Sequence, residues 1–306
     1  MMARTLPTSL LLSLRPEQWT KNLLVFAALI FSEKLLDPAS VRAATAAFGI
    51  FCVLSSVVYL INDVADRESD RQHPLKRLRP IAAGEVPVNV AIATAMVLGA
   101  VALGAAFILA PTFGIVAAVY LALMVAYSGP LKHIVIVDVL TISIGFVLRA
   151  LGGAAAIHVD ISHWLFVCTI LGAMFISLAK RRHELVLLAD GAIGHRKILG
   201  EYSAYLLDQM IAIVAAATLL SYILYTISPE TVQKFGTTAL ELTIPFPLYG
   251  IFRYLYLVHK REGGGSPADL LLQDRPLLAC VVLWVAAAVL IIYGSRFFPD
   301  LMVSHA

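Results

Sequence analysis

Acidic side chains recur at a four-residue spacing in one short stretch of this 306-residue chain. Asn62, Asp66 and Asp70 lie at positions i, i+4 and i+8, and Asp63 lies three residues before Asp66. On a helix, side chains three or four residues apart project from the same face. Mg²⁺ takes oxygen ligands from proteins and usually completes its shell with water and substrate phosphates. The spacing therefore predicts a catalytic cluster of these four residues, with Asn62, Asp66 and Asp70 as ligands of one or two Mg²⁺ ions.

A run of cations follows the acids directly. Lys76 and Arg79 are three residues apart in a segment bounded by Pro74 and Pro80, and Arg67 lies among the acids themselves. Lys and Arg bind the phosphate oxygens that Mg²⁺ bridges. An anionic lipid surface also attracts loops of this kind. We expect the three cations to contact a substrate diphosphate at the surface of a membrane.

The composition indicates a membrane protein. The chain is 60% hydrophobic and 14% charged, whereas soluble domains have about 45–50% apolar and about 25% charged residues. The sequence predicts an all-α polytopic membrane protein, with one transmembrane domain over residues 1–306. A spanning helix needs about 20 mostly apolar residues, and the candidate spans are residues 22–37, 41–61, 88–109, 113–128, 134–157, 163–179, 204–228, 238–258 and 276–297.

The distribution of charge predicts how the chain is oriented. Most of the 23 Lys and Arg residues fall in the N-terminal segment and in the loops at 63–87, 129–133, 180–203 and 259–275. The positive-inside rule places these segments in the cytoplasm and the C-terminus outside. Acidic residues contribute little to topology, yet they gather on the same side. We therefore expect a multi-pass protein of the inner (plasma) membrane with a polar site on its cytoplasmic side.

The predicted fifth span and the loop before it hold further candidates. An ionisable side chain inside a membrane span faces a cavity or a partner. Arg149 lies eleven residues after Asp138, which places it near the same helix face and about 16 Å deeper. We expect Lys132 and Asp138 to contact substrate, and Arg149 either to contact substrate or to pair with an acid on another helix. Tyr127 is either a substrate contact or an interfacial aromatic anchor.

Residues 62–84 resemble the first signature of the UbiA superfamily of intramembrane prenyltransferases, which is NDxxDxxxD followed by a basic, proline-bounded loop. The resemblance extends over residues 15–276. It implies a UbiA-like fold of nine transmembrane helices around a cytoplasm-facing polar cavity that binds a Mg²⁺-diphosphate.

The chain departs from the family at the second signature, an acidic DxxxD-like motif after the sixth span. The corresponding stretch here is Lys180-Arg181-Arg182-His183-Glu184, and a polar block at residues 15–22 precedes the first span. Both features resemble a branch of the superfamily that transfers 5-phosphoribosyl from phosphoribosyl diphosphate (PRPP) to a polyprenyl phosphate such as decaprenyl phosphate, for cell-wall arabinan synthesis. The resemblance implies substrate contacts for Lys21, Lys180, Arg181, Arg182 and Glu184.

The chemistry of that transfer needs few protein groups. The acceptor is an already anionic phosphate oxygen, so no general base is expected, and in-line attack inverts ribose C1. One alternative is an aromatic prenyltransferase with a prenyl diphosphate donor, which an intact second acidic signature would have favoured. Another is a lipid-binding or transport protein without chemistry, whose ionisable residues would be spread through the bilayer. A homo-oligomer is compatible with the apolar outer faces, and no nucleic-acid partner is expected.

Overall fold

The computed structural model describes residues 5–74, 76–187, 197–260 and 267–297. Every regular element in these ranges is a helix, which confirms the predicted all-α class. The chain groups into two compact units. The first comprises Met1–Leu29, Lys34–Ile161 and Asp190–Glu201, and the second comprises Ile30–Glu33, Ser162–Ala189 and Tyr202–Ala306. The single domain over residues 1–306 stays a prediction.

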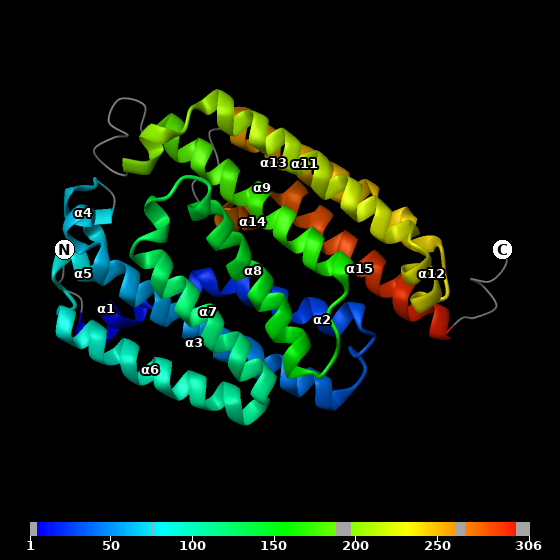
Figure 1. Cartoon of the computed structure of the whole chain (residues 1–306), viewed down its shortest axis with the longest axis horizontal. Helices are drawn as coiled ribbons and strands as arrows, with labels where there is room; N and C mark the ends of the chain where they lie inside the picture. The colour runs from blue at the N-terminus through cyan, green and yellow to red at the C-terminus, as the bar shows by residue number, and fades with distance from the viewer. Residues whose placement is uncertain (1–4, 75, 188–196, 261–266, 298–306) are drawn as a thin grey trace. The chain divides into compact units, whose positions relative to one another are not determined.

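The helices follow one another along the chain with short connections (Figure 1). In the first part of the chain they are α1 (Leu6–Ser13), η1 (Pro16–Leu24), α2 (Val25–Phe31), α3 (Pro38–Ala65), α4 (Arg67–Gln72), η2 (Lys76–Leu78), α5 (Pro80–Ala83), α6 (Val88–Leu109), α7 (Pro111–Ser128), η3 (Leu131–His133) and α8 (Val137–Ala156), where η marks a 3₁₀ helix. After these come α9 (His163–Leu187), η4 (Lys197–Glu201), α11 (Ala204–Ile227), α12 (Pro229–Phe235), η5 (Ala239–Thr243), α13 (Pro245–Lys260), α14 (Pro267–Gln273) and α15 (Arg275–Phe297).

Seven of the described helices are long and apolar enough to cross a membrane, namely α3, α6, α7, α8, α9, α11 and α15. The predicted count of nine is not reached in the described ranges. The only α-helix within the first predicted span is the seven-residue α2, about 10 Å long, which follows directly on the end of η1. It ends where Glu33 takes a left-handed backbone (φ 59°) and the Lys34 N–H donates to the Leu29 carbonyl at 3.1 Å, a Schellman-type stop. The eighth predicted span contains α13, whose 16 residues cover about 24 Å.

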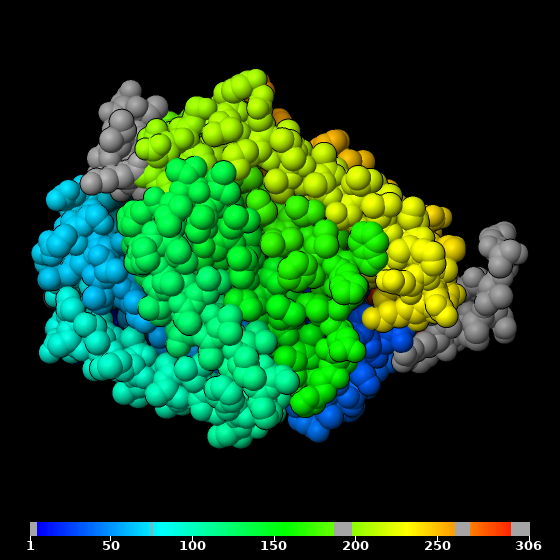
Figure 2. Space-filling model, viewed as in Figure 1, coloured from blue at the N-terminus to red at the C-terminus, as the bar shows by residue number. Residues whose placement is uncertain are grey.

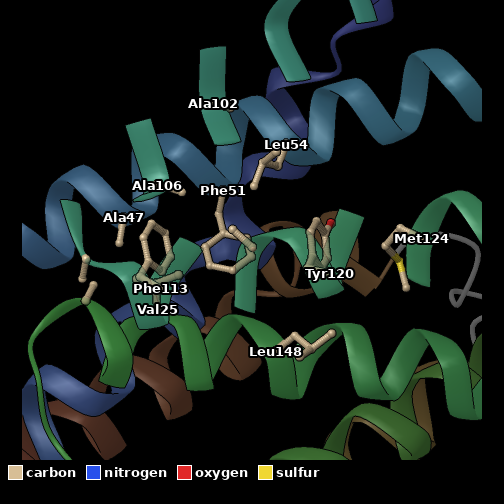
Figure 3. Close-up of a cluster of buried hydrophobic side chains, with 13 residues drawn as sticks. Val25, Ala47, Phe51, Leu54, Ala102, Ala106, Phe113, Tyr120, Met124 and Leu148 are labelled. Carbon is tan, nitrogen blue, oxygen red and sulfur yellow. The ribbon is translucent and has the colours of Figure 1, made fainter. Parts of the chain in front are cut away.

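The core of the first unit lies where α3, α6, α7 and α8 pack together (Figure 3). The Phe51 ring is central, with its centroid 5.6 Å from that of Phe113 and 5.3 Å from that of Tyr120. Two adjacent glycines of α8 make this packing possible. A Cβ on Gly152 would lie 2.4 Å from the Phe51 ring, and a Cβ on Gly153 would lie 2.0 Å from the Val25 carbonyl oxygen. The glycines thus bring α2 and α3 close to α8.

The outer face of α6 is apolar and open. Figure 2 shows the side chains of this turquoise helix uncovered on the face in view. Met96, Val97, Val101 and Ile108 are each more than half exposed. A continuous row of exposed aliphatic side chains over 22 residues suits contact with lipid tails rather than with water.

The second unit is built on two helix pairs, α13 with α15 and α9 with α11, of which the second pair can be followed in Figure 1. The Tyr222 hydroxyl accepts from the Trp284 indole at 2.7 Å and lies 2.5 Å from the Thr243 hydroxyl, which joins α11, α15 and η5. Asp274 caps α15 by accepting from the Leu277 N–H at 2.9 Å. Sheltered hydrogen bonds of this kind help to hold polar groups within apolar helices.

Candidate functional site

The acidic cluster forms at the junction of α3 and α4. Asn62 lies in the last turn of α3, Asp66 ends that helix, and Asp70 lies on α4. The backbone keeps helical bonds across the junction, because the Asp66 N–H donates to the Asn62 carbonyl (2.9 Å) and the Asp70 N–H to the Asp66 carbonyl (2.8 Å). The Asn62 amide also donates to the Asp66 carboxylate at 3.1 Å. The predicted four-residue register therefore brings Asn62 against Asp66 and keeps Asp70 one helical turn further along.

Asp63 and Asp70 are buried at 2% and 3% exposure and share one cation. Arg79 Nη1 lies 2.6 Å from Asp70 Oδ2 and 3.2 Å from Asp63 Oδ1. Arg15 Nη2 lies 2.5 Å from the same Asp63 oxygen. Burial raises the pKa of the Asp70 carboxyl above its ordinary value, and the nearby Arg79 guanidinium opposes that rise. Two buried carboxylates are thus held by two guanidinium groups.

Lys132 supplies the third cation. It lies in η3, between the end of α7 and the start of α8, and its ammonium group pairs with Asp66. The Lys132 side chain is 9% exposed and that of Asp66 is 26% exposed. Residues 66 positions apart in the chain therefore meet at the ends of α3 and α7. The predicted cluster and the predicted loop cation form one site.

The donor atoms of the cluster suit a hard divalent cation. Asn62, Asp66 and Asp70 offer carboxylate and amide oxygens, which Mg²⁺ prefers. The Asn62 amide nitrogen faces Asp66, so its carbonyl oxygen remains for another contact. Within the described ranges, no three His, Cys, Asp or Glu side chains are arranged as a metal-binding group. The fit thus rests on donor chemistry, and the carboxylates themselves lie against cations.

Arg67 has spare hydrogen-bonding capacity beside the cluster. Its Nη1 lies 3.7 Å from Glu68 Oε1. Its Nε is buried and has no hydrogen-bond partner among the described residues. A buried donor without an acceptor is unfavourable by about 1–3 kcal/mol. An anionic ligand oxygen at this position would satisfy it, and the substrate contact of Arg67 stays a prediction.

The remaining residues of the first unit that the sequence predicted as substrate contacts lie on different helices. Asp138 is fully buried in the first turn of α8. Lys76 opens η2 and lies near enough to Asp70 to oppose, together with Arg79, the rise of its pKa that burial causes. Lys21 Nζ lies 3.5 Å from the Tyr59 hydroxyl. Tyr127 is half-buried in the last turn of α7.

Arg149 is buried in α8 and is bound by neutral groups. It donates from Nε to Asn22 Oδ1 (2.7 Å), from Nη1 to the Gly145 carbonyl (2.8 Å) and from Nη2 to the Tyr120 hydroxyl (2.8 Å). Its guanidinium also lies over the rings of Tyr120 and Phe146. All three of these hydrogen-bond acceptors are uncharged. The contacts therefore differ from the expected alternative of a buried pair between Arg149 and an acid on another helix.

The basic stretch of α9 belongs to the second unit. Arg181 donates to Glu184 Oε2 at 2.6 Å, and Lys180 Nζ lies 3.9 Å from Glu184 Oε1. Arg182 pairs with Asp208 of α11, whose Oδ1 also lies 3.2 Å from His259 Nε2 of α13. These cations thus already have acidic partners. Asp190 and Arg196, which continue this polar loop, lie outside the described residues.

Two residues of these networks were not singled out from the sequence. Arg15 lies in the polar block before the first span, but its sequence neighbours give no sign that it reaches Asp63, 48 residues away. Asp208 lies in the first turns of an apolar span. An acid in such a position is itself a signal of a partner or a site.

Known proteins resemble this chain over most of its length. The profile of the UbiA prenyltransferase family matches residues 22–268. A decaprenyl-phosphate phosphoribosyltransferase from Mycobacterium tuberculosis is 36% identical over 280 residues, covering 90% of this chain and 91% of the relative. A protein of the same name from Mycolicibacterium smegmatis is 35% identical over 305 residues, with 95% of each chain covered.

A solved structure has the same fold. The structure of a UbiA homolog from Archaeoglobus fulgidus bound to GPP and Mg²⁺ superimposes with a TM-score of 0.72, covering 93% of this chain and 99% of that chain at 18% sequence identity. At this identity the likeness concerns the arrangement of helices. The family match and the seven long apolar helices together indicate an integral membrane protein.

Proposed function

Because this chain belongs to the UbiA prenyltransferase family, we propose that it transfers 5-phosphoribosyl from PRPP to decaprenyl phosphate. The products are diphosphate and decaprenylphosphoryl-5-phosphoribose, a precursor for cell-wall arabinan. The names of its relatives support the reaction class. The observation that carries the proposal for this chain is the cluster in which Arg15, Arg79 and Lys132 meet the carboxylates of the NDxxDxxxD motif.

The carboxylates and the cations have complementary tasks. Asn62, Asp66 and Asp70 would hold Mg²⁺, which when bound withdraws electron density from the leaving diphosphate and offsets its charge. Arg79 and Lys132 already lie against the same carboxylates, so they stand within reach of a diphosphate that a metal there would bind. Their guanidinium and ammonium groups stabilise the charge that builds on the leaving oxygen as the bond to ribose C1 breaks.

The acceptor phosphate is an anion and attacks without losing a proton. No His or Ser is needed as a general base, and the protein's task is to align the two substrates. In-line displacement at C1 of the α-configured donor gives a β-linked product. The extra phosphates of donor and acceptor call for further cations, and Arg67, with its buried donor, is the first candidate in the described site. Lys180, Arg181 and Arg182 are the candidates of the second unit.

The location of the cluster suits a lipid-bound acceptor. Asp66 ends α3, Lys132 follows α7, and Asp138 begins α8, so the site lies at the ends of three membrane-spanning helices. The headgroup of a membrane-anchored phosphate lies at that depth. We place the site on the cytoplasmic side of the plasma membrane, with the N-terminus inside and the C-terminus outside, because Lys and Arg are concentrated on that side.

A donor assay on the purified protein in detergent tests the function. PRPP labelled in the ribose is supplied with decaprenyl phosphate and Mg²⁺, and label extracted with the lipid is counted. We expect label that depends on the acceptor and disappears with EDTA. Label that resists EDTA would contradict the metal role. No label from PRPP, combined with turnover of a prenyl diphosphate and an aromatic acceptor, would replace the proposal with the aromatic prenyltransferase.

A further inference from the structure

Arg15 holds an unusual backbone conformation immediately before η1. Its φ and ψ are 52° and 62°, in the left-handed region that non-glycine residues seldom occupy. Such a residue is unfavourable by about 1–3 kcal/mol and persists where surrounding contacts hold it. Its guanidinium pairs with Asp63 and lies over the Tyr59 ring at 4.9 Å. The segment that follows Arg15 must therefore supply the contacts that keep it in place.

The first of these contacts is centred on Ser56. Its Oγ accepts from the Trp19 indole N–H at 3.0 Å and lies 2.8 Å from the Leu14 carbonyl oxygen and 2.9 Å from that of Cys52. Ser56 thus links the residue before Arg15 to one four positions after it. Ser56, Tyr59 and Asp63 are spaced by three and four residues, so they share a face of α3.

The second contact lies deeper and is centred on Asn22. This fully buried amide donates to Ser55 Oγ at 3.2 Å and approaches Cys52 Sγ at 3.4 Å. It accepts from Arg149, which is in turn held by Gly145 and by the Tyr120 hydroxyl, visible on the labelled ring in Figure 3. Arg149 thereby ties η1 to α7 and α8.

These contacts give η1 a single register on α3. As the chain advances from Arg15 through Trp19 to Asn22, its partners on α3 step back from Asp63 through Ser56 to Cys52. The two segments therefore run antiparallel. A change at the deep end alters where Arg15 lies at the shallow end, about 16 Å away along α3.

We infer that Trp19, Asn22 and Arg149 are positioning residues that hold Arg15 in its left-handed conformation for contact with the donor diphosphate. The inference rests on the proposed function, since it assigns these residues to the same site. It gives Arg149 a task other than the two expected from the sequence, a direct substrate contact or a pair with an acid on another helix. The guanidinium acts through Asn22, because three of its N–H groups already have protein acceptors.

A double-mutant cycle on diphosphate binding tests the inference. The dissociation constant of inorganic pyrophosphate with Mg²⁺ is measured for the full-length protein, Trp19→Phe, Arg15→Gln and the double variant. Trp19→Phe keeps the ring and removes the N–H. We expect it to weaken binding about threefold to tenfold alone and by less than about twofold in the Arg15→Gln background. An equal loss in both backgrounds overturns the inference.

The matched control is Trp164→Phe in α9, which makes the same chemical change in the second unit. We expect it to leave the pyrophosphate constant unchanged. Ser56→Ala provides an independent variant with the same expected coupling to Arg15, should Trp19→Phe fold poorly. A fall in melting temperature with an unchanged binding constant, in both variants, would assign these contacts to stability alone and overturn the inference.

Arg149→Lys separates geometry from charge. Lysine keeps the cation but lacks the planar fork that joins Asn22, Gly145 and Tyr120. We expect it to raise the PRPP KM about as much as Arg149→Met does. Recovery of wild-type KM by lysine overturns positioning through Asn22. A wild-type protein that binds pyrophosphate but transfers no label from PRPP would instead overturn the proposed function, while the binding cycle still decides the role of Trp19.

Discussion

Arg79 donates to Asp70 at 2.6 Å from the far side of a proline-containing loop, nine residues further along the chain. The same nitrogen reaches Asp63, which is almost completely buried. The loop after α4 is thereby folded back onto the acidic cluster. This return makes a single site of two sequence features, the spaced acids and the cations that follow them.

The carboxylates at the helix junction should be essential for turnover. We expect Asp66→Ala and Asp70→Ala each to lower kcat at least about 100-fold, because each removes a carboxylate that would hold Mg²⁺ at the leaving diphosphate. The protein should stay folded in detergent, as judged by size-exclusion chromatography. Glu68→Ala is the matched control, since that carboxylate lies between the two in sequence but is 74% exposed and pairs with Arg71. Retained turnover in both aspartate variants would contradict the metal assignment.

Loss of Arg79 should affect stability as well as binding. Arg79→Gln leaves the buried Asp70 without its guanidinium partner, and an uncompensated buried carboxylate is unfavourable by roughly 1–3 kcal/mol. We expect a lower melting temperature and a higher PRPP KM. Adding Asp70→Asn should recover part of the melting temperature but none of the KM. A double variant as unstable as the single one would show that the pair does not stabilise the fold.

Metal and diphosphate should strengthen each other's binding. A divalent cation at Asp66 and Asp70 competes with Lys132 and Arg79 for the carboxylates. A bound diphosphate gives Lys132 and Arg79 a new anionic partner, so these two cations no longer compete with Mg²⁺ for the carboxylates. Titration calorimetry should therefore show Mg²⁺ binding more tightly in the presence of pyrophosphate, and pyrophosphate more tightly in the presence of Mg²⁺, by the same factor. Independent binding constants would count against this arrangement.

The second unit offers a way to separate a phosphate contact from a helix contact. If Arg182 meets a substrate phosphate, Arg182→Ala should raise the PRPP KM about tenfold, the effect of losing roughly one charge-assisted hydrogen bond. Asp208→Asn removes the present partner but keeps the guanidinium, so it should leave KM nearly unchanged. Equal effects of the two substitutions on KM would indicate that the pair only joins α9 to α11.

The sequence alone was sufficient for features that depend on local spacing. Helical periodicity places Asn62, Asp66 and Asp70 on successive turns, and the backbone bonds across the α3–α4 junction keep that register. The long membrane helices can also be identified from the sequence, because a membrane span depends only on the length and hydrophobicity of a run of consecutive residues. Helices that stop early were harder to predict. The chain leaves α2 through a left-handed backbone at Glu33, and a glutamate side chain gives no sign of that conformation.

Only the tertiary structure shows which distant partners each charge has. Lys132 reaches Asp66, and Arg15 reaches Asp63, because α3, α7 and η1 pack with their polar ends on one side. Arg149 is bound by Asn22, 127 residues before it, where an acid on another helix was one expectation. Spacing along one helix is set by 3.6 residues per turn, but pairing between helices depends on how their apolar faces pack, and that is a property of the whole fold.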